Sequence, residues 1–364
     1  MNLFARTLAA VSLLHVAAMW IPPVTWGVWM VRFGALELAP LAAITGVAAI
    51  AATSEPWVRA LGLVGVVAGL LPALWITPIY LREGAGFSPT RWLGAPEPTA
   101  TRTVDVPFGD GLVADVYRPP GPGPHPWVIL VHGGSWRAGD KGDLPHQAHA
   151  LALAGYVVVD LRYRLAPFPA AIEDVRKAIV EVHARASELD LDPDRGALLG
   201  RSAGGQIALV AAYAPAEAFA PAAPPVRAVV AIYAPTDLAW DHANPYVPDV
   251  VDGTSALEAY LGGTPSQSAE TYRRATPMTW VDGPVPATLL VHGTAERCVR
   301  PVNAERLRDA LVAHGQAART LFVPFADHGF DVRRGGLGEQ LARHVVLDFL
   351  GRALPAAGAA PTAP

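Results

Sequence analysis

A serine inside a Gly-x-Ser-x-Gly pattern, Gly200 to Gly204, is the first group in this chain that could carry out chemistry. It follows a short apolar run at 196–199 and precedes residues 206–213, which have helical composition. A strand, a sharp turn and a helix form the context in which such a serine, here Ser202, stands exposed at the carboxyl end of a strand and on a helix N-terminus. The pattern alone also fits an ordinary glycine turn, because the chain has 34 glycines.

A second motif, His132-Gly133-Gly134, favours the catalytic interpretation. It directly follows residues 126–131, an apolar run typical of a buried strand. Glycines at this point let backbone N–H groups approach a substrate oxygen closely. With the N–H of Ala203 they would form an oxyanion hole, in which one donor is worth roughly 2.7–4 kcal/mol. Together the two motifs predict a serine nucleophile that attacks a carbonyl carbon.

Such a serine needs a base, and the base needs an acid that holds its tautomer; on this type of sheet the chain order is serine, acid, histidine. His328 is expected to be the base, since it lies in a loop after the apolar run at 321–325, while the other histidines lie in helices or turn motifs. Glu296 is expected to be the acid, because it follows the apolar run at 286–291 and its His-Gly turn. Asp327 is the reserve candidate, although a residue adjacent to the base normally points elsewhere and caps the loop.

From about Thr101 to Leu350 the chain resembles the α/β-hydrolase esterases, in their hormone-sensitive-lipase-like and feruloyl-esterase-like branch. Besides the two glycine motifs, the resemblance rests on four stretches in matching order, residues 160–167, 168–175, 192–195 and 292–294. It implies an α/β-hydrolase fold, a mostly parallel sheet with helices on both faces. It also implies a carboxylic ester hydrolase that uses no cofactor, and the sequence shows no metal-ligand spacing.

Three residues depart from the family's usual pattern. Glu296 stands where an aspartate is usual, and its extra methylene requires a slightly retracted backbone. Arg201, beside the nucleophile, stands where relatives often carry an acidic residue; it is expected to pair with a nearby carboxylate or to contact an anionic substrate. Gln206 replaces a histidine found in part of the branch, and the sequence does not define the consequence.

The first 83 residues have the composition of a membrane segment. The charged residues among the first 90 are Arg6, Arg32, Glu37, Glu55, Arg59, Arg82 and Glu83. Residues 61–80 are uncharged and long enough to cross a hydrocarbon core of roughly 30 Å. With residues 8–31, which Pro22-Pro23 interrupts, and residues 38–52, they predict about three transmembrane helices. A signal peptide is the competing interpretation for residues 1–20, but no small-residue cleavage site follows.

Two further features of this segment bear on its placement. Tryptophans lie mostly near the ends of the apolar stretches, as in an interfacial aromatic belt. Gly65 and Gly69 have the spacing of a helix-packing face, but glycine is common enough in such helices that the spacing alone does not predict one. A multi-pass protein of the cell membrane is therefore predicted. The arginines are divided between the two sides, and the small excess at Arg32, Arg82 and Arg91 favours a cytoplasmic hydrolase without fixing the orientation.

The predicted organisation is a transmembrane region over residues 1–83, a linker over 84–100, a catalytic domain over 101–352 and a disordered tail over 353–364. Apolar runs alternate with helical stretches in the catalytic domain, which predicts a parallel sheet covered on both faces. The long segment 238–281 interrupts the alternation, and its aromatic residues are expected either to roof the substrate site or to pack in the core. These are Trp240, Tyr246, Tyr260, Tyr272 and Trp280.

Composition sets the remaining limits. A net charge of −4 carries no nucleic-acid signature. The single cysteine, Cys298, excludes an internal disulfide. Lysine occurs only at Lys141 and Lys177 while arginine, alanine, proline and glycine abound, a bias typical of GC-rich bacterial genomes.

The sequence thus predicts a membrane-anchored serine hydrolase that cleaves a small-molecule acyl ester, with lipid-like esters among the candidates, through a Ser-His-Glu triad and an acyl-enzyme. An arylformamidase or amidase would use the same triad, and a membrane-bound binding protein of hydrolase fold would use none. If residues 1–82 only anchor the enzyme, a protein that begins near Gly84 should hydrolyse small soluble esters at nearly the full rate.

Overall fold

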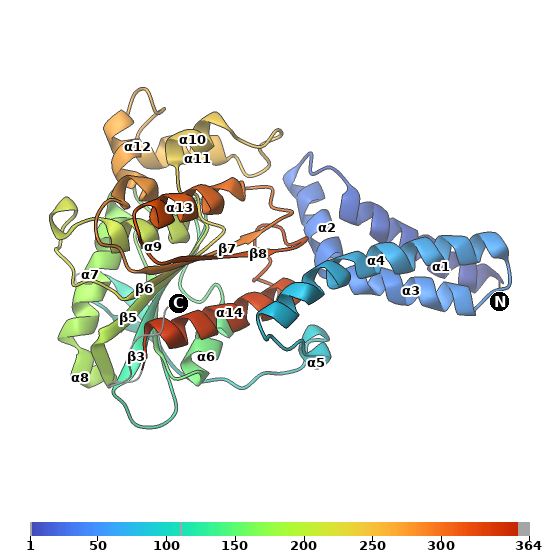
Figure 1. The fold of residues 1–364 in the computed structure, drawn as a ribbon, viewed down its shortest axis with the longest axis horizontal. Coiled ribbons are helices and arrows are strands. Elements are labelled where there is room, and N and C mark those ends of the chain that lie inside the picture. Colours follow the sequence, from blue (N-terminus) through green and yellow to red (C-terminus); the bar gives the residue numbers. More distant parts are fainter. Residues whose placement is uncertain (1, 110, 356–364) are drawn as a thin grey trace.

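The structure, a computed structural model, describes residues 2–109 and 111–355 of the 364-residue chain. It consists of a helical arm, formed by the N-terminal residues, and a larger α/β body (Figure 1). Most of the predicted C-terminal tail, from residue 356 onward, lies outside the described residues. Its first residue, Ala353, ends the last helix of the body.

Four helices form the arm. They are α1 (Asn2–Trp20), α2 (Trp26–Glu37), α3 (Ala39–Ala51) and α4 (Pro56–Arg82). The expectation that residues 8–31 form one helix is wrong, because α1 ends before Pro22-Pro23 and α2 begins after them. Proline has no backbone N–H to donate and disfavours helical backbone in the residue before it. Thr25 then caps α2, since its side chain accepts a hydrogen bond from the N–H of Val28.

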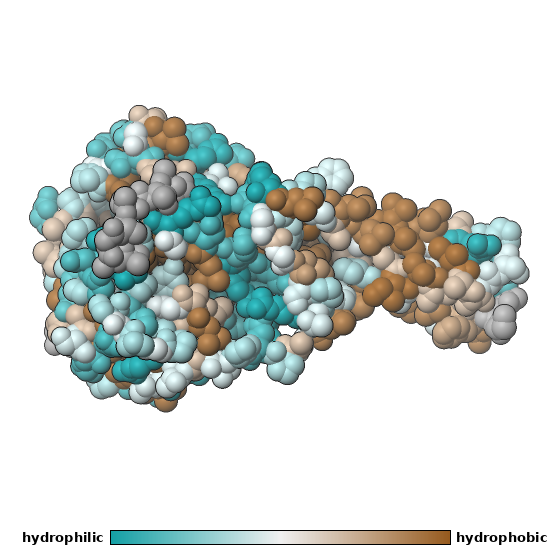
Figure 2. Space-filling model, turned by 60° about the horizontal axis from the view of Figure 1, so that its bottom comes forward, coloured by the Kyte–Doolittle hydropathy of each residue, from teal (hydrophilic) through white to brown (hydrophobic). Residues whose placement is uncertain are grey.

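The arm has the length and surface of a membrane segment. Helices α1 and α4 are each long and apolar enough to cross a membrane, and α2 with α3, bent by 65° at their junction, would make a third span if they count as one. Figure 2 shows the arm covered by apolar residues along much of its length, with more polar residues at its free end. Gly65 and Gly69 pack against other helices, because a Cβ at Gly65 would overlap the hydroxyl of Ser12 in α1 and one at Gly69 would overlap the backbone of Ala43 in α3.

One sheet of eight strands runs through the body, in the order β1-β2-β4-β3-β5-β6-β7-β8. The strands are β1 (Thr101–Pro107), β2 (Val113–Arg118), β3 (His125–Val131), β4 (Val157–Arg162), β5 (Leu191–Arg201), β6 (Ala228–Ile232), β7 (Ala287–Gly293) and β8 (Ala318–Val323). Strand β2 is antiparallel to both its neighbours and all other pairs from β4 to β8 are parallel, so the prediction of a mostly parallel sheet is confirmed. The edge strand β1 was not predicted, because its residues are polar and largely exposed.

Helices cover both faces of the sheet, as the alternating pattern predicts. One face packs against α7 (Ala170–Ala184), α9 (Ala203–Tyr213) and α13 (Val302–Ala313), and the other against α6 (Pro145–Leu153) and α14 (Leu337–Ala353). The shorter helices α8 (Ala186–Leu189), α10 (Leu238–Ala243), α11 (Gly253–Leu261) and α12 (Ala269–Ala275) and the 3-10 turns at Ala216–Ala218 and Pro277–Trp280 complete the body.

The arm is packed onto the body along the end of α4. Ile76 and Tyr80 of α4 belong to the same buried cluster as residues of α14, and the Tyr80 hydroxyl donates a hydrogen bond to the carbonyl of Leu337 at 2.6 Å. The stretch predicted as a linker, residues 84–100, contains the short helix α5 (Pro89–Trp92) and also contacts the body. The N–H of Ser88 there donates to the side chain of Gln340 at 2.8 Å.

Candidate active site

Ser202 occupies the sharp turn between β5 and α9, with φ 51° and ψ −124°. This backbone conformation is uncommon for a residue with a side chain and is found where function requires it. The turn is tight, because a Cβ at Gly200 would overlap the backbone of Gly204. The glycines of the motif thus let the chain fold back on itself and leave the serine at the end of the strand, as predicted.

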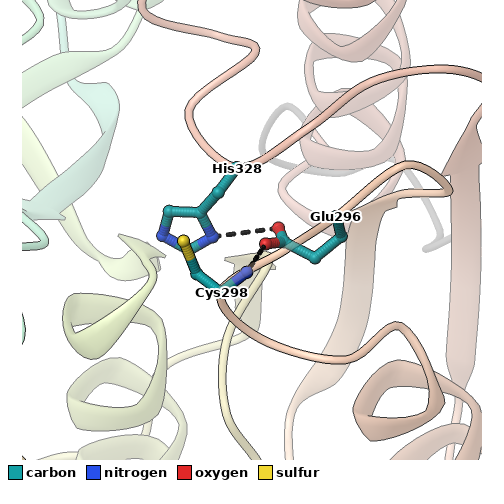
Figure 3. Close-up of side chains that lie close together, drawn as sticks. All are labelled: Glu296, Cys298 and His328. Carbon is teal, nitrogen blue, oxygen red and sulfur yellow. Dashed lines mark hydrogen bonds and ion pairs between the residues drawn. The ribbon is translucent and has the colours of Figure 1, made fainter. Parts of the chain in front are cut away.

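His328 lies between Ser202 and Glu296. Its Nε2 is 3.0 Å from Ser202 Oγ, and its Nδ1 is 2.9 Å from Glu296 Oε2. The other carboxylate oxygen of Glu296 accepts a hydrogen bond from the N–H of Cys298 at 2.7 Å (Figure 3). It also accepts one from the N–H of Val299 at 3.2 Å. Glu296 and His328 come from the loops after the adjacent parallel strands β7 and β8. The structure therefore brings the three predicted residues into one hydrogen-bonded chain.

Asp327, the reserve acid, does not contact the imidazole. Its carboxylate accepts the backbone N–H of His328 at 2.8 Å and pairs with Arg32 of α2. Both partners of this ion pair are buried, with side chains 9% and 0% exposed. The sequence interpretation of Asp327 as a carboxylate that caps its own loop agrees with this geometry, whereas its partner in the arm was missed. The available signal was a lone arginine inside an apolar stretch, which normally has a buried partner.

The groups around His328 favour the ionised form of Glu296 and the protonated form of His328. Burial alone would raise the pKa of Glu296, but the neighbouring His328 and the hydrogen bonds to the carboxylate hold that pKa below its usual value. Burial alone would lower the pKa of His328, but Glu296, Asp327 and Asp331 raise that pKa above its ordinary value. An imidazolium formed at His328 is therefore stabilised where it stands.

The predicted oxyanion residues line the same cavity as Ser202. A Cβ at Gly133 would lie 3.3 Å from the Cβ of Ser202. Gly134 has φ +119°, and a Cβ there would overlap the carbonyl of Ala138, so only glycine fits. Over residues 2–109 and 111–355, no hydrogen-bond acceptor is found for the N–H groups of Gly133 and Gly134. These two N–H groups therefore have no partner among the described residues, as donors to an oxyanion would have to be.

The structure shows which groups are contacted by two of the residues that depart from the family pattern, Arg201 and Gln206. Arg201 Nη1 lies 3.8 Å from a carboxylate oxygen of Asp331 and 3.4 Å from the Tyr233 hydroxyl, so it pairs with a carboxylate while also lining the cavity. Gln206 accepts a hydrogen bond from the indole N–H of Trp136 at 2.8 Å and donates one to the carbonyl of Ala275 at 2.7 Å. This amide therefore ties the glycine loop of β3 to the segment that covers the site.

The cavity has a volume of about 420 Å³, within the range of small-molecule sites. The long segment predicted to roof the site contributes to its wall, although only one of its five aromatic residues, Tyr246, lines the cavity. Tyr260 instead stacks on Trp136 at 5.0 Å between ring centroids, and Tyr272 is buried in the core. Sequence reasoning missed the other lining residues of this segment, because its polar and apolar residues follow no regular period. They include Asp241, Asn244, Pro245, Asp249, Val251 and Leu257.

Glu296, Cys298 and His328 also place three potential metal-ligand atoms within 4.8 Å of one another (Figure 3). Burial and the nearby carboxylates raise the pKa of the Cys298 thiol well above its ordinary value, which disfavours the thiolate that binds metals. Both nitrogens of His328 already have partners in Ser202 and Glu296. The arrangement therefore suits activation of the Ser202 hydroxyl by His328 better than the binding of a metal ion.

Known proteins resemble the body of this chain. The model of the BD-FAE family matches residues 114–311, more than half of the chain. In Mycobacterium tuberculosis, a probable carboxylic ester hydrolase, LipM, is 29% identical over 256 residues, which cover 66% of this chain and 57% of LipM. Esterase LipC of the same organism is 31% identical over 240 residues, which cover 62% of this chain and 58% of LipC. The chain thus spans little more than half the length of these curated relatives.

Solved structures share the fold. A thermophilic esterase of Thermogutta terrifontis, Est2, superposes with a TM-score of 0.59 at 23% sequence identity, covering 72% of this chain and 96% of Est2. A bifunctional GH43-CE protein of Bacteroides eggerthii superposes with a TM-score of 0.61 at 24% identity, covering 71% of this chain and 38% of that protein. The chain therefore belongs to the BD-FAE family, whose model covers more than half of it, and its body shares the α/β-hydrolase fold of these solved structures.

Proposed function

We propose that this protein is a membrane-anchored serine esterase that cleaves carboxylic esters through Ser202, His328 and Glu296. The observation that carries the proposal is the continuous hydrogen-bonded chain from Ser202 Oγ through the imidazole to Glu296. Ser202, at the end of this chain, lines a cavity together with Gly133 and Gly134. The esterase names of the relatives support the same reaction class.

In the proposed reaction, His328 Nε2 takes the hydroxyl proton as Ser202 Oγ attacks the ester carbonyl carbon. Glu296 keeps the proton on Nδ1 and stabilises the imidazolium. The N–H groups of Gly133, Gly134 and Ala203 donate to the carbonyl oxygen as it becomes negative. The C–O bond to the alcohol then breaks, and the alcohol leaves with the proton from Nε2. Water, deprotonated by His328, hydrolyses the acyl-enzyme and releases the acid.

Membrane anchoring is the second part of the proposal. The apolar surface of the arm and the lengths of α1 and α4 support it. Arg6 and Glu55 pair at 3.0 Å between α1 and the turn before α4. The start of α1 and the turn before α4 lie at the free end of the arm, and the body lies at the opposite end (Figure 1). The active-site residues all belong to the body, so hydrolysis takes place outside the hydrocarbon core.

Two measurements on the purified full-length protein test the proposal. A fluorophosphonate probe should label the wild type and leave Ser202→Ala unlabelled, since only an activated serine reacts. Nitrophenyl esters of graded chain length and arylformamides, assayed side by side, should show faster turnover of the esters. Lack of labelling in a folded wild-type protein would support a binding protein without chemistry, and faster turnover of the arylformamides would indicate an amidase.

A further inference from the structure

A groove lies on the seam between the arm and the body, next to the active-site cavity. One wall is the loop between α1 and α2, and the other is mainly the loop after α10, at residues 246–250. We call it the seam groove. Its volume is about 320 Å³, and its lining includes Trp20, Val24 and Arg32 of the arm and Tyr246, Val247 and Arg297 of the body.

Tyr246 lines both the seam groove and the active-site cavity. This residue is therefore shared by the walls of the two spaces. Guanidinium groups lie over this ring, Arg300 at 4.2 Å and Arg297 at 5.7 Å from the ring centroid. A path from the groove to the cavity that holds Ser202 would therefore pass Tyr246.

The rims of the seam groove are unusually apolar for a surface in water. Val247, on the body side, is 93% exposed, and Val24, on the arm side, is 58% exposed. Trp20 and Trp26, at the two ends of the α1–α2 loop, are 55% and 60% exposed. Exposed apolar patches mark sites of contact with a partner, and tryptophans at the end of an apolar helix are typical of the membrane interface. The partner best matched to these rims is the bilayer that the arm itself enters.

We propose that the seam groove admits the acyl chain of an ester dissolved in the bilayer, so that its carbonyl group reaches Ser202 from the membrane side. This inference rests on the proposed esterase function and names its substrate class as long-chain, membrane-partitioned acyl esters. The apolar walls receive the chain, and Arg297, exposed at the same groove, faces the polar headgroup layer. The reaction is the hydrolysis described above, and the groove determines only which esters arrive.

The test compares two substrates on the full-length protein reconstituted in phosphatidylcholine vesicles. One is a water-soluble nitrophenyl acetate and the other a long-chain nitrophenyl ester dissolved in the bilayer. Val247→Asp should lower the ratio of long-chain to acetate turnover by about tenfold, because a charge on the rim opposes passage of an apolar chain. Val247→Leu should keep the ratio. Val312→Asp, the same exchange at a 59% exposed site on α13, is the matched control and should also keep it.

The inference is overturned if Val247→Asp leaves the ratio unchanged, or if Val312→Asp lowers it equally. Because Val247 is almost fully exposed, its substitution is not expected to disturb folding, which circular dichroism would verify. Failure of the proposed function has a different signature. In that case the wild type hydrolyses neither substrate, and the fluorophosphonate probe does not label Ser202.

Discussion

Arg32, in the second helix of the arm, forms a buried ion pair with Asp327, the residue directly before His328. Asp327 also holds the backbone N–H of His328, so the pair connects the arm to the loop that carries the base. Two residues earlier, Phe325 lies edge-on to Trp20 and Trp75 of the arm, at 6.1 and 6.3 Å between ring centroids. The arm is therefore part of the support of this loop, in addition to the anchoring role proposed for it.

Replacement of Arg32 by Met should destabilise the protein and slow hydrolysis. The change leaves the Asp327 carboxylate buried without its partner, a situation that typically costs about 3–5 kcal/mol. Chemical denaturation and kcat on a soluble ester measure the two effects. The double variant Arg32→Met with Asp327→Asn removes both charges and should recover part of the loss. If the losses of the two single variants simply add in the double variant, the ion pair does not support the loop.

A protein that begins at Gly84 should lose most of its activity, even toward small soluble esters. This expectation replaces that of the pure anchor, because truncation removes Arg32 from Asp327 and exposes the cluster in which Ile76 and Tyr80 pack against α14. Turnover of nitrophenyl acetate and circular dichroism of the truncated protein provide the measurement. A folded truncated protein with the full-length rate would show that the arm only anchors.

Ser202→Ala should reduce turnover by roughly 10⁴-fold or more, by analogy with the removal of other triad nucleophiles. The free energy of unfolding should change little, since the serine hydroxyl contributes one hydrogen bond to His328. Steady-state kinetics of the purified variant, with its melting curve as the control, test this expectation. Near-normal esterase activity in the variant would remove Ser202 from the mechanism.

Glu296→Gln and Asp327→Asn should differ in the kind of damage they cause. Glutamine at 296 can no longer fix the tautomer of His328, so a loss of roughly 10⁴-fold in kcat is expected. Asparagine at 327 leaves the contact between Glu296 and Nδ1 intact but leaves Arg32 unpaired, so its main effect should be on the denaturation midpoint. The opposite ranking in kcat would give the role of acid to Asp327.

The sequence allowed Ser202, Glu296 and His328 to be predicted because each follows a recognisable strand, and parallel strands end at one edge of their sheet. Contacts that depend on tertiary packing could not be predicted in this way. Arg32 and Asp327 are 295 residues apart in the chain, and the apolar composition of α2 is the same whether its neighbour is lipid or protein. The bond from Trp136 to Gln206 was equally hidden: Gln206 stood out as a departure from the family pattern, but its partner lies 70 residues away in the chain.

The pH dependence of kcat/KM should show an acid limb set by His328 above the ordinary histidine pKa of about 6.5. Glu296, Asp327 and Asp331 raise this pKa by stabilising the imidazolium, and the enzyme is active only when His328 is neutral. Activity should therefore rise with pH through this shifted value. Asp327→Asn removes a negative charge beside the imidazolium and leaves the positive charge of Arg32 unbalanced. Both effects lower the pKa of His328, so the acid limb should move to lower pH. In the double variant with Arg32→Met the shift should be smaller, since a neutral pair replaces an ion pair. A limb that stays in place in Asp327→Asn, measured on a soluble ester between pH 5 and 9, would show that this carboxylate does not act on the base.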